Sequence, residues 1–253
     1  MSLFDKFKKH KITNDNWEFY QAYDEDGNIS FTTIDLSYND PPKQVGFLGE
    51  LFVRVRIPEQ KIHEGIPIPE EHSFQNEKEE ELCEALVKSR IDCIQVGRIT
   101  YFGQKQYIFE YNNLDGFKSI FNSWKNSFST DYEIELNLLS PFEYYVDLLP
   151  DKFIWQQIGN RHVIERLLEA GSNEQKEHFI EHGIFGKQDD LKSLFNELKN
   201  HDISLISIEE DLMEVGIKST LDLDEITNQT NYLMSVAEEH NCKYDGWNTK
   251  IEK

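Results

Sequence analysis

Two segments of this chain show the same order of hydrophobic periodicities, and this recurrence limits the possible folds more than any other feature. In the first segment, Val53, Val55 and Ile57 alternate with polar residues, as expected for a half-buried strand. The elements that follow in the first segment are a helix at 76–90, two strands at 94–111, a helix at 117–128 and a strand at 131–139. The sequence therefore predicts a β-α-β-β-α-β order.

The second segment repeats this order. A strand-like stretch at 176–186 precedes a helix in which Leu191, Leu194 and Leu198 share one face, and residues 203–219 predict a hairpin that turns near Glu210. Another helix is lined by Ile226, Leu233, Val236 and Ala237, and residues 242–249 form a closing strand. We expect an α+β protein with two ferredoxin-like α/β sandwich domains, each an antiparallel sheet with helices on one face.

Three local signals define the segments outside these two units. The polar stretch "DEDGN" between two alternating runs predicts an additional hairpin before the first unit. Ser140, Pro141 and Glu143 have the spacing of a helix N-cap, and the helix at 162–170 is expected to stop at Gly171. Asn76 and Glu79 would form a second capping box. We place the domain boundary near residue 150, which gives domains at 1–150 and 151–253.

The net charge excludes several classes of partner. With 26 basic and 47 acidic residues the formal charge is −21, and a field of this sign repels phosphate backbones and anionic membrane surfaces. The basic stretch "KFKKHK", Lys6–Lys11, is interpreted as a solvated terminus. No apolar run resembles a signal peptide or a membrane span. We expect a cytoplasmic protein that binds neither nucleic acid nor membrane.

The sequence offers little evidence for catalysis or for a cofactor. It contains no G-x-S-x-G, Walker loop, H-E-x-x-H or G-x-G-x-x-G motif. Cys83, Cys93 and Cys242 include no C-x-x-C pair, which argues against a disulfide framework. His178 and His182 lie on a predicted strand, where four residues span about 13 Å, too far for one shared metal ion. We expect no catalytic residue, no cofactor and no metal.

The C-terminal stretch "YDGWNT" contains the candidate partner-binding residues. Tyr244 and Trp247 flank Asp245 and Gly246, a pair that suits a tight turn. The aromatic side chains can pack on the sheet, or they can form a displayed contact, because Tyr and Trp are frequent in interface hot spots. We expect Trp247 to be first a packing residue of the last strand, and the acidic surroundings to favour a basic partner.

The C-terminal segment resembles the regulator of ribonuclease E activity B (RraB) family. The resemblance rests on "VIERLLEAGSN" at 163–173, "IEH" at 180–182 and "LMSVAEEHNCKYDGWNT" at 233–249. It implies an acidic α+β protein without catalytic activity that binds the ribonuclease and modulates RNA decay. The N-terminal segment, with "WEFYQAY" and "VRVRIP", is similar to a family of unknown function that often precedes such a domain.

Two alternatives to a ribonuclease regulator remain open from the sequence. The N-terminal domain could bind a small molecule or act as an enzyme, with Trp17, Tyr20, Arg54 and Arg56 lining a cleft. A structural or oligomerisation module that uses exposed sheet edges is the other alternative. The sequence does not indicate an oligomeric state. The leading interpretation is a non-enzymatic regulator whose protein partner is ribonuclease E-like or presents another basic segment.

Overall fold

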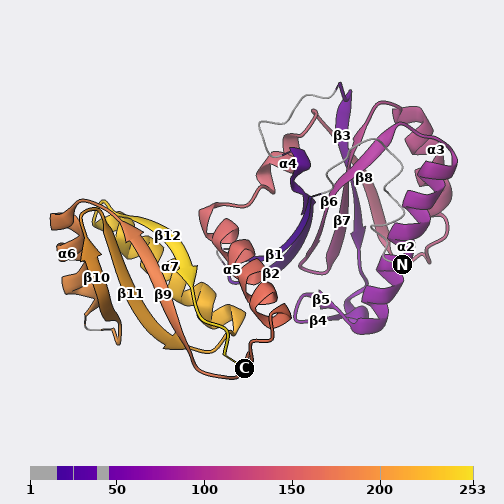
Figure 1. The fold of residues 1–253 in the computed structure, drawn as a ribbon. Coiled ribbons are helices and arrows are strands. Elements are labelled where there is room, and N and C mark those ends of the chain that lie inside the picture. Colours follow the sequence, from indigo (N-terminus) through magenta and orange to yellow (C-terminus); the bar gives the residue numbers. More distant parts are fainter. Residues whose placement is uncertain (1–15, 25, 39–45, 200, 253) are drawn as a thin grey trace. The chain divides into compact units, whose positions relative to one another are not determined.

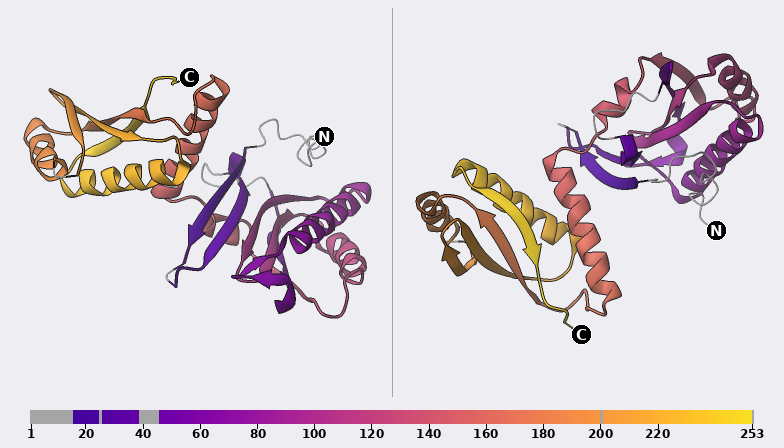
Figure 2. Two further views of the ribbon diagram at one scale, coloured as in Figure 1. Left: turned by 90° about the horizontal axis from the view of Figure 1, so that it is seen from below. Right: turned by 45° about the horizontal axis from the view of Figure 1, so that its top comes forward.

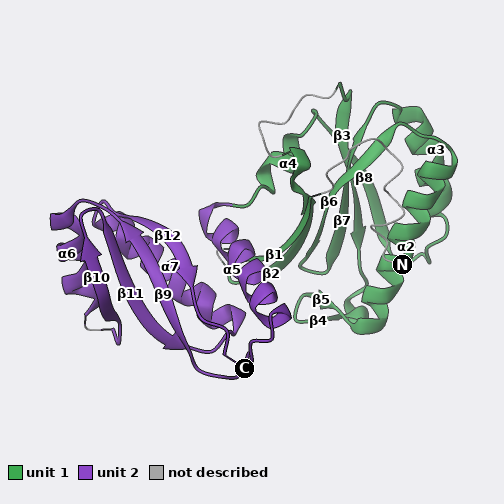
Figure 3. Ribbon diagram, in the orientation of Figure 1, with its two compact units in different colours: residues 1–150 green, residues 151–253 purple. Residues whose placement is uncertain are grey.

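The computed structural model describes the whole chain except residues 1–15, 25, 39–45, 200 and 253. The basic stretch Lys6–Lys11 lies outside the described residues. The chain divides into two compact units, Met1–Pro150 and Asp151–Lys253 (Figure 3). Each unit combines helices with an antiparallel sheet, so the predicted α+β class is confirmed.

Unit 1 is built around a six-stranded sheet in the order β1-β2-β6-β7-β3-β8, in which every neighbouring pair is antiparallel (Figure 1). Its strands are β1 (Trp17–Tyr23), β2 (Ile29–Asp35), β3 (Gly49–Arg56), β6 (Cys93–Tyr101), β7 (Gln104–Tyr111) and β8 (Glu133–Leu139). The predicted hairpin is confirmed, because β1 pairs with β2 at the edge of this sheet.

Two helices, α2 (Pro69–Lys88) and α3 (Leu114–Lys125), cover one face of this sheet. The core between them contains Leu82 from α2, Phe117 and Trp124 from α3, and Val53 and Tyr107 from the sheet. Short elements complete the unit: two 3-10 helices (Leu36–Tyr38 and Glu59–Lys61), a small sheet of β4 (Ile62–His63) and β5 (Ile66–Pro67), and α4 (Glu143–Asp147).

Helix α4 packs on the face of the unit 1 sheet that α2 and α3 leave uncovered. Its first backbone amides reach the side chains of Glu50 and Glu110, which point away from the core side chains Leu51 and Phe109. The expectation that all helices of this unit lie on one face is therefore wrong for α4. The reason is that the buried side-chain oxygens of Glu50 and Glu110 on that face accept the free N–H groups at the start of the helix.

Unit 2 has a four-stranded sheet in the order β10-β11-β9-β12, again with only antiparallel neighbours. Its elements are α5 (Lys152–Glu169), β9 (His178–Phe185), α6 (Gln188–Leu198), β10 (Ser204–Glu209), β11 (Leu212–Ser219), α7 (Leu223–Glu239) and β12 (Lys243–Asn248). Helices α6 and α7 lie against one face of the sheet (Figure 2), and the core there includes Leu191, Leu194, Met213, Val215 and Leu233.

Several predicted element boundaries need correction. Helix α2 begins at Pro69 rather than at Asn76, because proline suits the first helical position, and Asn76 instead bonds Lys105 from within the helix. The N-cap position of α4 is Phe142 and not Ser140, although the Glu143 carboxylate does accept the Ser140 N–H at 2.9 Å. Helix α5 ends before Gly171, as predicted, but it starts at Lys152.

Candidate protein-binding surface

The "YDGW" stretch is part of edge strand β12 and not of a turn. A β-bulge lies between Tyr244 and Gly246, and Gly246 has a φ of +138°, which an L side chain rarely adopts. The bulge places Tyr244 opposite Ile184 and Trp247 opposite His182, so both aromatic side chains lie on the face that the helices cover. The expected Asp-Gly turn is wrong, whereas the predicted closing strand is confirmed.

Trp247 is half-buried and takes part in a polar network. Its Nε1 donates to Asn160 Oδ1 at 2.8 Å, and Asn160 Nδ2 donates to Thr230 Oγ1 at 2.9 Å. Asn160 is fully buried on α5, and Thr230 is fully buried on α7. One amide side chain therefore joins α5, α7 and β12, with both of its polar atoms bonded, as burial requires.

Tyr244 contacts a buried histidine. Its hydroxyl lies 3.0 Å from His182 Nδ1, and burial lowers the pKa of His182 to about 4. Burial also raises the pKa of the Tyr244 hydroxyl. Both side chains are therefore neutral near pH 7, so this hydrogen bond joins a neutral hydroxyl and a neutral imidazole, whose tautomer decides which of the two donates. Tyr244 and Trp247 therefore hold β12 against unit 2 through their contacts with His182 and Asn160.

Within the part of unit 2 that the structure describes, the opposite side of the sheet has no helix over it (Figure 2). We call this side the open face, and the strand registers assign to it Phe179, Glu181, Gly183, Phe185, Leu212, Glu214, Gly216, Lys218, Lys243 and Asn248, together with the bulge residue Asp245. Phe179 and Phe185 on this face are 43% and 37% exposed.

Phe179 lies across Gly216 on the neighbouring strand. A Cβ atom at position 216 would come within 2.0 Å of Phe179 Cζ, so only glycine lets the ring lie on the sheet in this position. Acidic side chains surround the apolar centre, namely Glu181, Glu214 and Asp245. Of the two lysines on this face, Lys218 is paired with Glu177 at 2.9 Å, and Lys243 lies opposite Phe185. The open face thus combines exposed aromatic rings with acidic groups.

The two histidines of the "HFIEH" stretch do not form a joint site. His178 and His182 both lie on strand β9 and are fully buried, four positions apart, which corresponds to about 13 Å along a strand. His178 Nε2 lies 3.0 Å from the carbonyl oxygen of Asn173. In the described part of the chain, no group of three or more metal-ligating side chains is present.

Unit 1 does not gather the four residues expected to line a cleft. Trp17 and Tyr20 are on β1, whereas Arg54 and Arg56 are on β3, and three strands separate them, which corresponds to about 19 Å. Arg54 pairs with Glu135 and Arg56 with Glu133 across to β8. That grouping is therefore wrong, although Arg56 does line a separate hollow of about 490 Å³ beside Phe102.

Two buried groups of ionisable side chains in unit 1 were not predicted from the sequence. Glu79 of α2 accepts two hydrogen bonds from Arg98 and one from Gln95, and lies 3.6 Å from the buried amine of Lys105. Burial lowers the pKa of Lys105 to about 8. Opposite charges compensate one another in this group, which makes it part of the core.

The second group is the carboxyl pair Glu50 and Glu110. These residues oppose each other on β3 and β7 and are both fully buried. Burial raises the pKa of Glu110 to about 8 and also raises that of Glu50. No local motif marks this pair, because the residues are 60 positions apart and meet only through strand pairing.

Comparisons with known proteins agree with the two-part architecture. Residues 157–249 match the family described as Regulator of ribonuclease activity B (RraB), and residues 15–149 match a family of unknown function, DUF695. A search of curated proteins gives no match. A crystal structure of an unknown protein from Galdieria sulphuraria aligns with 80% of this chain and 99% of its own at 9% identity, but its TM-score of 0.21 supports no argument.

Across the described residues, no helix is long and apolar enough to cross a membrane.

Proposed function

This chain belongs to the DUF695 family and carries an RraB domain behind it, and from this premise we propose that it is a non-enzymatic regulator of a ribonuclease. The observation that carries the proposal is the match of residues 157–249 to a family of ribonuclease regulators. The resemblance named above makes a ribonuclease E-like enzyme the leading partner. The match covers nearly all of unit 2, so the regulatory contact belongs to that unit.

We also interpret the central part of each unit as ferredoxin-like. The strand orders β6-β7-β3-β8 and β10-β11-β9-β12 each have two helices on one face, which supports this interpretation. In this arrangement the helices cover one face of the sheet and leave the other available. The open face of unit 2 is therefore the natural docking surface.

The occupant of the open face is a basic segment of the partner. Residues 151–253 contain 11 basic and 21 acidic side chains, a net charge of −10, which attracts cationic groups. Exposed Phe179 and Phe185 supply apolar area for the aliphatic stems of lysine and arginine. Within the "YDGW" stretch, Asp245 is the exposed member that can contact such a segment directly, with Gly246 beside it, while Tyr244 and Trp247 support the strand.

The test measures binding and inhibition together. The purified full chain is titrated into ribonuclease E from the native host, in a calorimeter and in an RNA-cleavage assay, at low and high salt. A Glu181→Gln/Asp245→Asn variant removes two charges from the open face, and since a solvent-exposed ion pair contributes about 0.2 to 1 kcal/mol, binding should weaken about 2- to 30-fold. A Glu169→Gln/Glu239→Gln variant, with the same charge change on α5 and α7, is the control.

The expected result is salt-sensitive binding that only the open-face variant weakens, because screening shortens the reach of exposed charges. Equal affinity of both variants would place the contact elsewhere. No heat of binding and unchanged RNA cleavage would remove ribonuclease E as the partner. If the chain alone cleaved RNA, without the ribonuclease, the proposal of a non-enzymatic protein would be wrong.

A further inference from the structure

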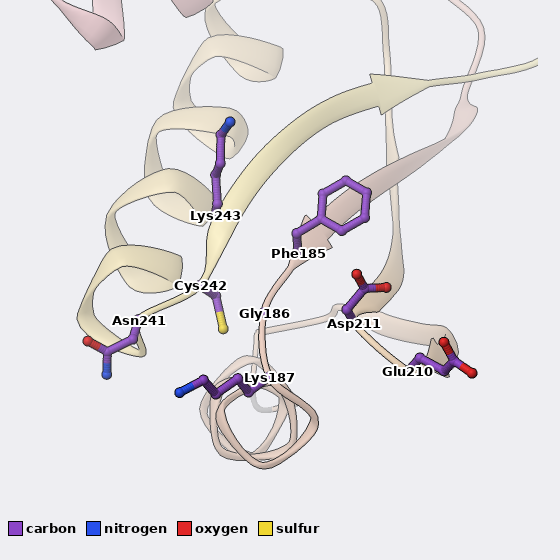
Figure 4. A pocket seen from close by; sticks show the side chains of 8 residues that line it. All are labelled: Phe185, Gly186, Lys187, Glu210, Asp211, Asn241, Cys242 and Lys243. Atoms are coloured by element: carbon purple, nitrogen blue, oxygen red, sulfur yellow. The ribbon is translucent and has the colours of Figure 1, made fainter.

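A hollow of about 480 Å³ lies at the end of the unit 2 sheet where β9 stops and β12 starts (Figure 4). It is formed by the end of β9, the first residue before α6, the β10–β11 turn and the start of β12. The residues that line it are Phe185, Gly186, Lys187, Glu210, Asp211, Asn241, Cys242 and Lys243. We call it the end pocket.

The walls of the end pocket carry opposite charges. Figure 4 shows Lys187 and Lys243 on one side of the Gly186 backbone, and Glu210 and Asp211 on the other side, next to Phe185. Considering only the described residues, none of these four charged side chains forms an ion pair or a hydrogen bond with another side chain. Their charges are therefore free to bind a ligand without first breaking an internal contact.

The floor of the end pocket has to be glycine. A Cβ atom at Gly186 would come within 2.5 Å of Cys242 Sγ, a side chain that is itself buried. The Gly186 N–H donates to the Asp211 carbonyl at 2.9 Å, which ties the floor to the acidic wall. Glu210 and Asn241 have left-handed backbone conformations, with φ of 27° and 55°, in the turns that form the two walls. The pocket thus keeps a bare centre between two walls of opposite charge.

The end pocket is continuous with the open face. Phe185 and Lys243 oppose each other across β9 and β12 on that face, and both also line the pocket. A segment that lies along β9 on the open face would therefore run directly into the pocket. A segment with basic side chains only would fit the end pocket poorly. One basic side chain could bind the acidic wall, but the next would be repelled by Lys187 and Lys243.

On the basis of the proposed function, we propose that the end pocket binds an oppositely charged pair of side chains in the partner segment. An arginine side chain stacks on Phe185 between Glu210 and Asp211, as guanidinium groups do on aromatic rings beside carboxylates. An acidic side chain close to it in the partner binds Lys187 and Lys243. The end pocket then selects a mixed-charge stretch and fixes the direction of the basic segment on the open face.

The experiment uses the ¹⁵N-labelled full chain and short peptides with blocked ends. The probe is acetyl-Arg-Gly-Glu-amide, and the comparisons are the Arg-Gly-Arg, Glu-Gly-Glu and neutral citrulline-Gly-Gln peptides. We expect the probe to shift the amide signals of Gly186, Asp211 and Lys243 in a saturable manner at millimolar concentration, and the other peptides to bind at least fivefold more weakly. Asp211→Asn and Lys243→Gln should each lower the affinity for the probe. The control variants Glu169→Gln and Lys250→Gln should leave this affinity unchanged.

Equal shifts with all charged peptides, or none with the probe, would overturn this inference. A separate titration with an oligolysine peptide reports on the open face through the amides of Phe179 and Glu181. Shifts there without any response of the end pocket to the probe would reject the mixed-charge site and leave the proposed docking of a basic segment intact. Absence of both responses would reject the pocket and the docking surface together.

Discussion

The buried carboxyl pair of unit 1 predicts an unusual dependence of stability on pH. Glu50 and Glu110 face each other between β3 and β7, and together they accept the N–H groups of Phe142, Tyr144 and Tyr145 at 2.7 to 2.9 Å. Burial raises the pKa of Glu110 from 4.5 to about 8, so the folded unit holds a proton that the unfolded chain releases. The stabilisation is complete below pH 4.5 and is lost as the pH rises through 8.

The perturbation is Glu110→Gln, which replaces the protonated carboxyl by an amide of the same shape. The amide oxygen can still accept the Phe142 N–H, and the amide NH₂ can donate to Glu50 at any pH. The pKa shift of Glu110 corresponds to at most about 4 kcal/mol between pH 5 and pH 8, at 1.36 kcal/mol per unit. Water that reaches the pair when α4 opens would reduce this value, so we expect about 2 to 4 kcal/mol.

The measurement is the urea concentration at which peptides from β3 and β7 lose protection, read by pulsed hydrogen exchange at pH 5 and pH 8. The original chain should lose stability between these pH values relative to the Glu110→Gln variant, which should be the more stable protein at pH 8. Glu77→Gln, on the exposed side of α2, controls for the loss of one charge. An equal change in urea midpoint between pH 5 and pH 8 for all three proteins would refute the idea that folded Glu110 holds a proton.

Three further predictions concern packing and domain structure. Trp247→Phe keeps an aromatic ring but removes the hydrogen bond from β12 to Asn160 Oδ1, so the free energy of unfolding of unit 2, measured in denaturant, should fall by about 1 to 3 kcal/mol. Trp247→Ala should lower it further. Gly216→Ala should displace the Phe179 ring and destabilise the unit, and Phe179→Ala in the same chain should remove most of this cost in a double-mutant cycle. Limited proteolysis should cut near residue 150 and release two stable fragments; fragments that are digested as soon as they appear would contradict the independence of the units.

Periodicity made most of the secondary structure predictable. The positions that share a helical face in the sequence, such as Leu191, Leu194 and Leu198, are the ones that the structure buries. Helix ends were harder to predict. The start of α2 at Pro69, for example, has no side-chain cap that would mark it. The predicted capping box at Asn76 was wrong because Asn76 lies inside α2, where its side chain accepts a hydrogen bond from Lys105.

The candidate sites depend on features that a single sequence shows poorly. Glu50 and Glu110 become a pair only through strand register, and the end pocket gathers residues from three separate turns. In an acidic chain, single carboxylates give no signal, because most of them are solvated. The aromatic content of "YDGW" was visible, but its orientation was not.

The bulge in β12 determines that orientation, and it leads to a last prediction. In a regular strand, residues three positions apart point to opposite faces, so Tyr244 and Trp247 could not both pack under the helices. They do so because Asp245 and Gly246 together oppose the single residue Gly183. Deletion of Asp245 should therefore preserve the contacts of Tyr244 with His182 and of Trp247 with Asn160, whereas an alanine inserted after Gly246 should move Trp247 out of register with His182 and break its hydrogen bond to Asn160. Thermal unfolding and tryptophan fluorescence distinguish the two variants: the deletion should keep a half-buried Trp247, and an insertion variant as stable as the original chain would show that the bulge does not determine the packing.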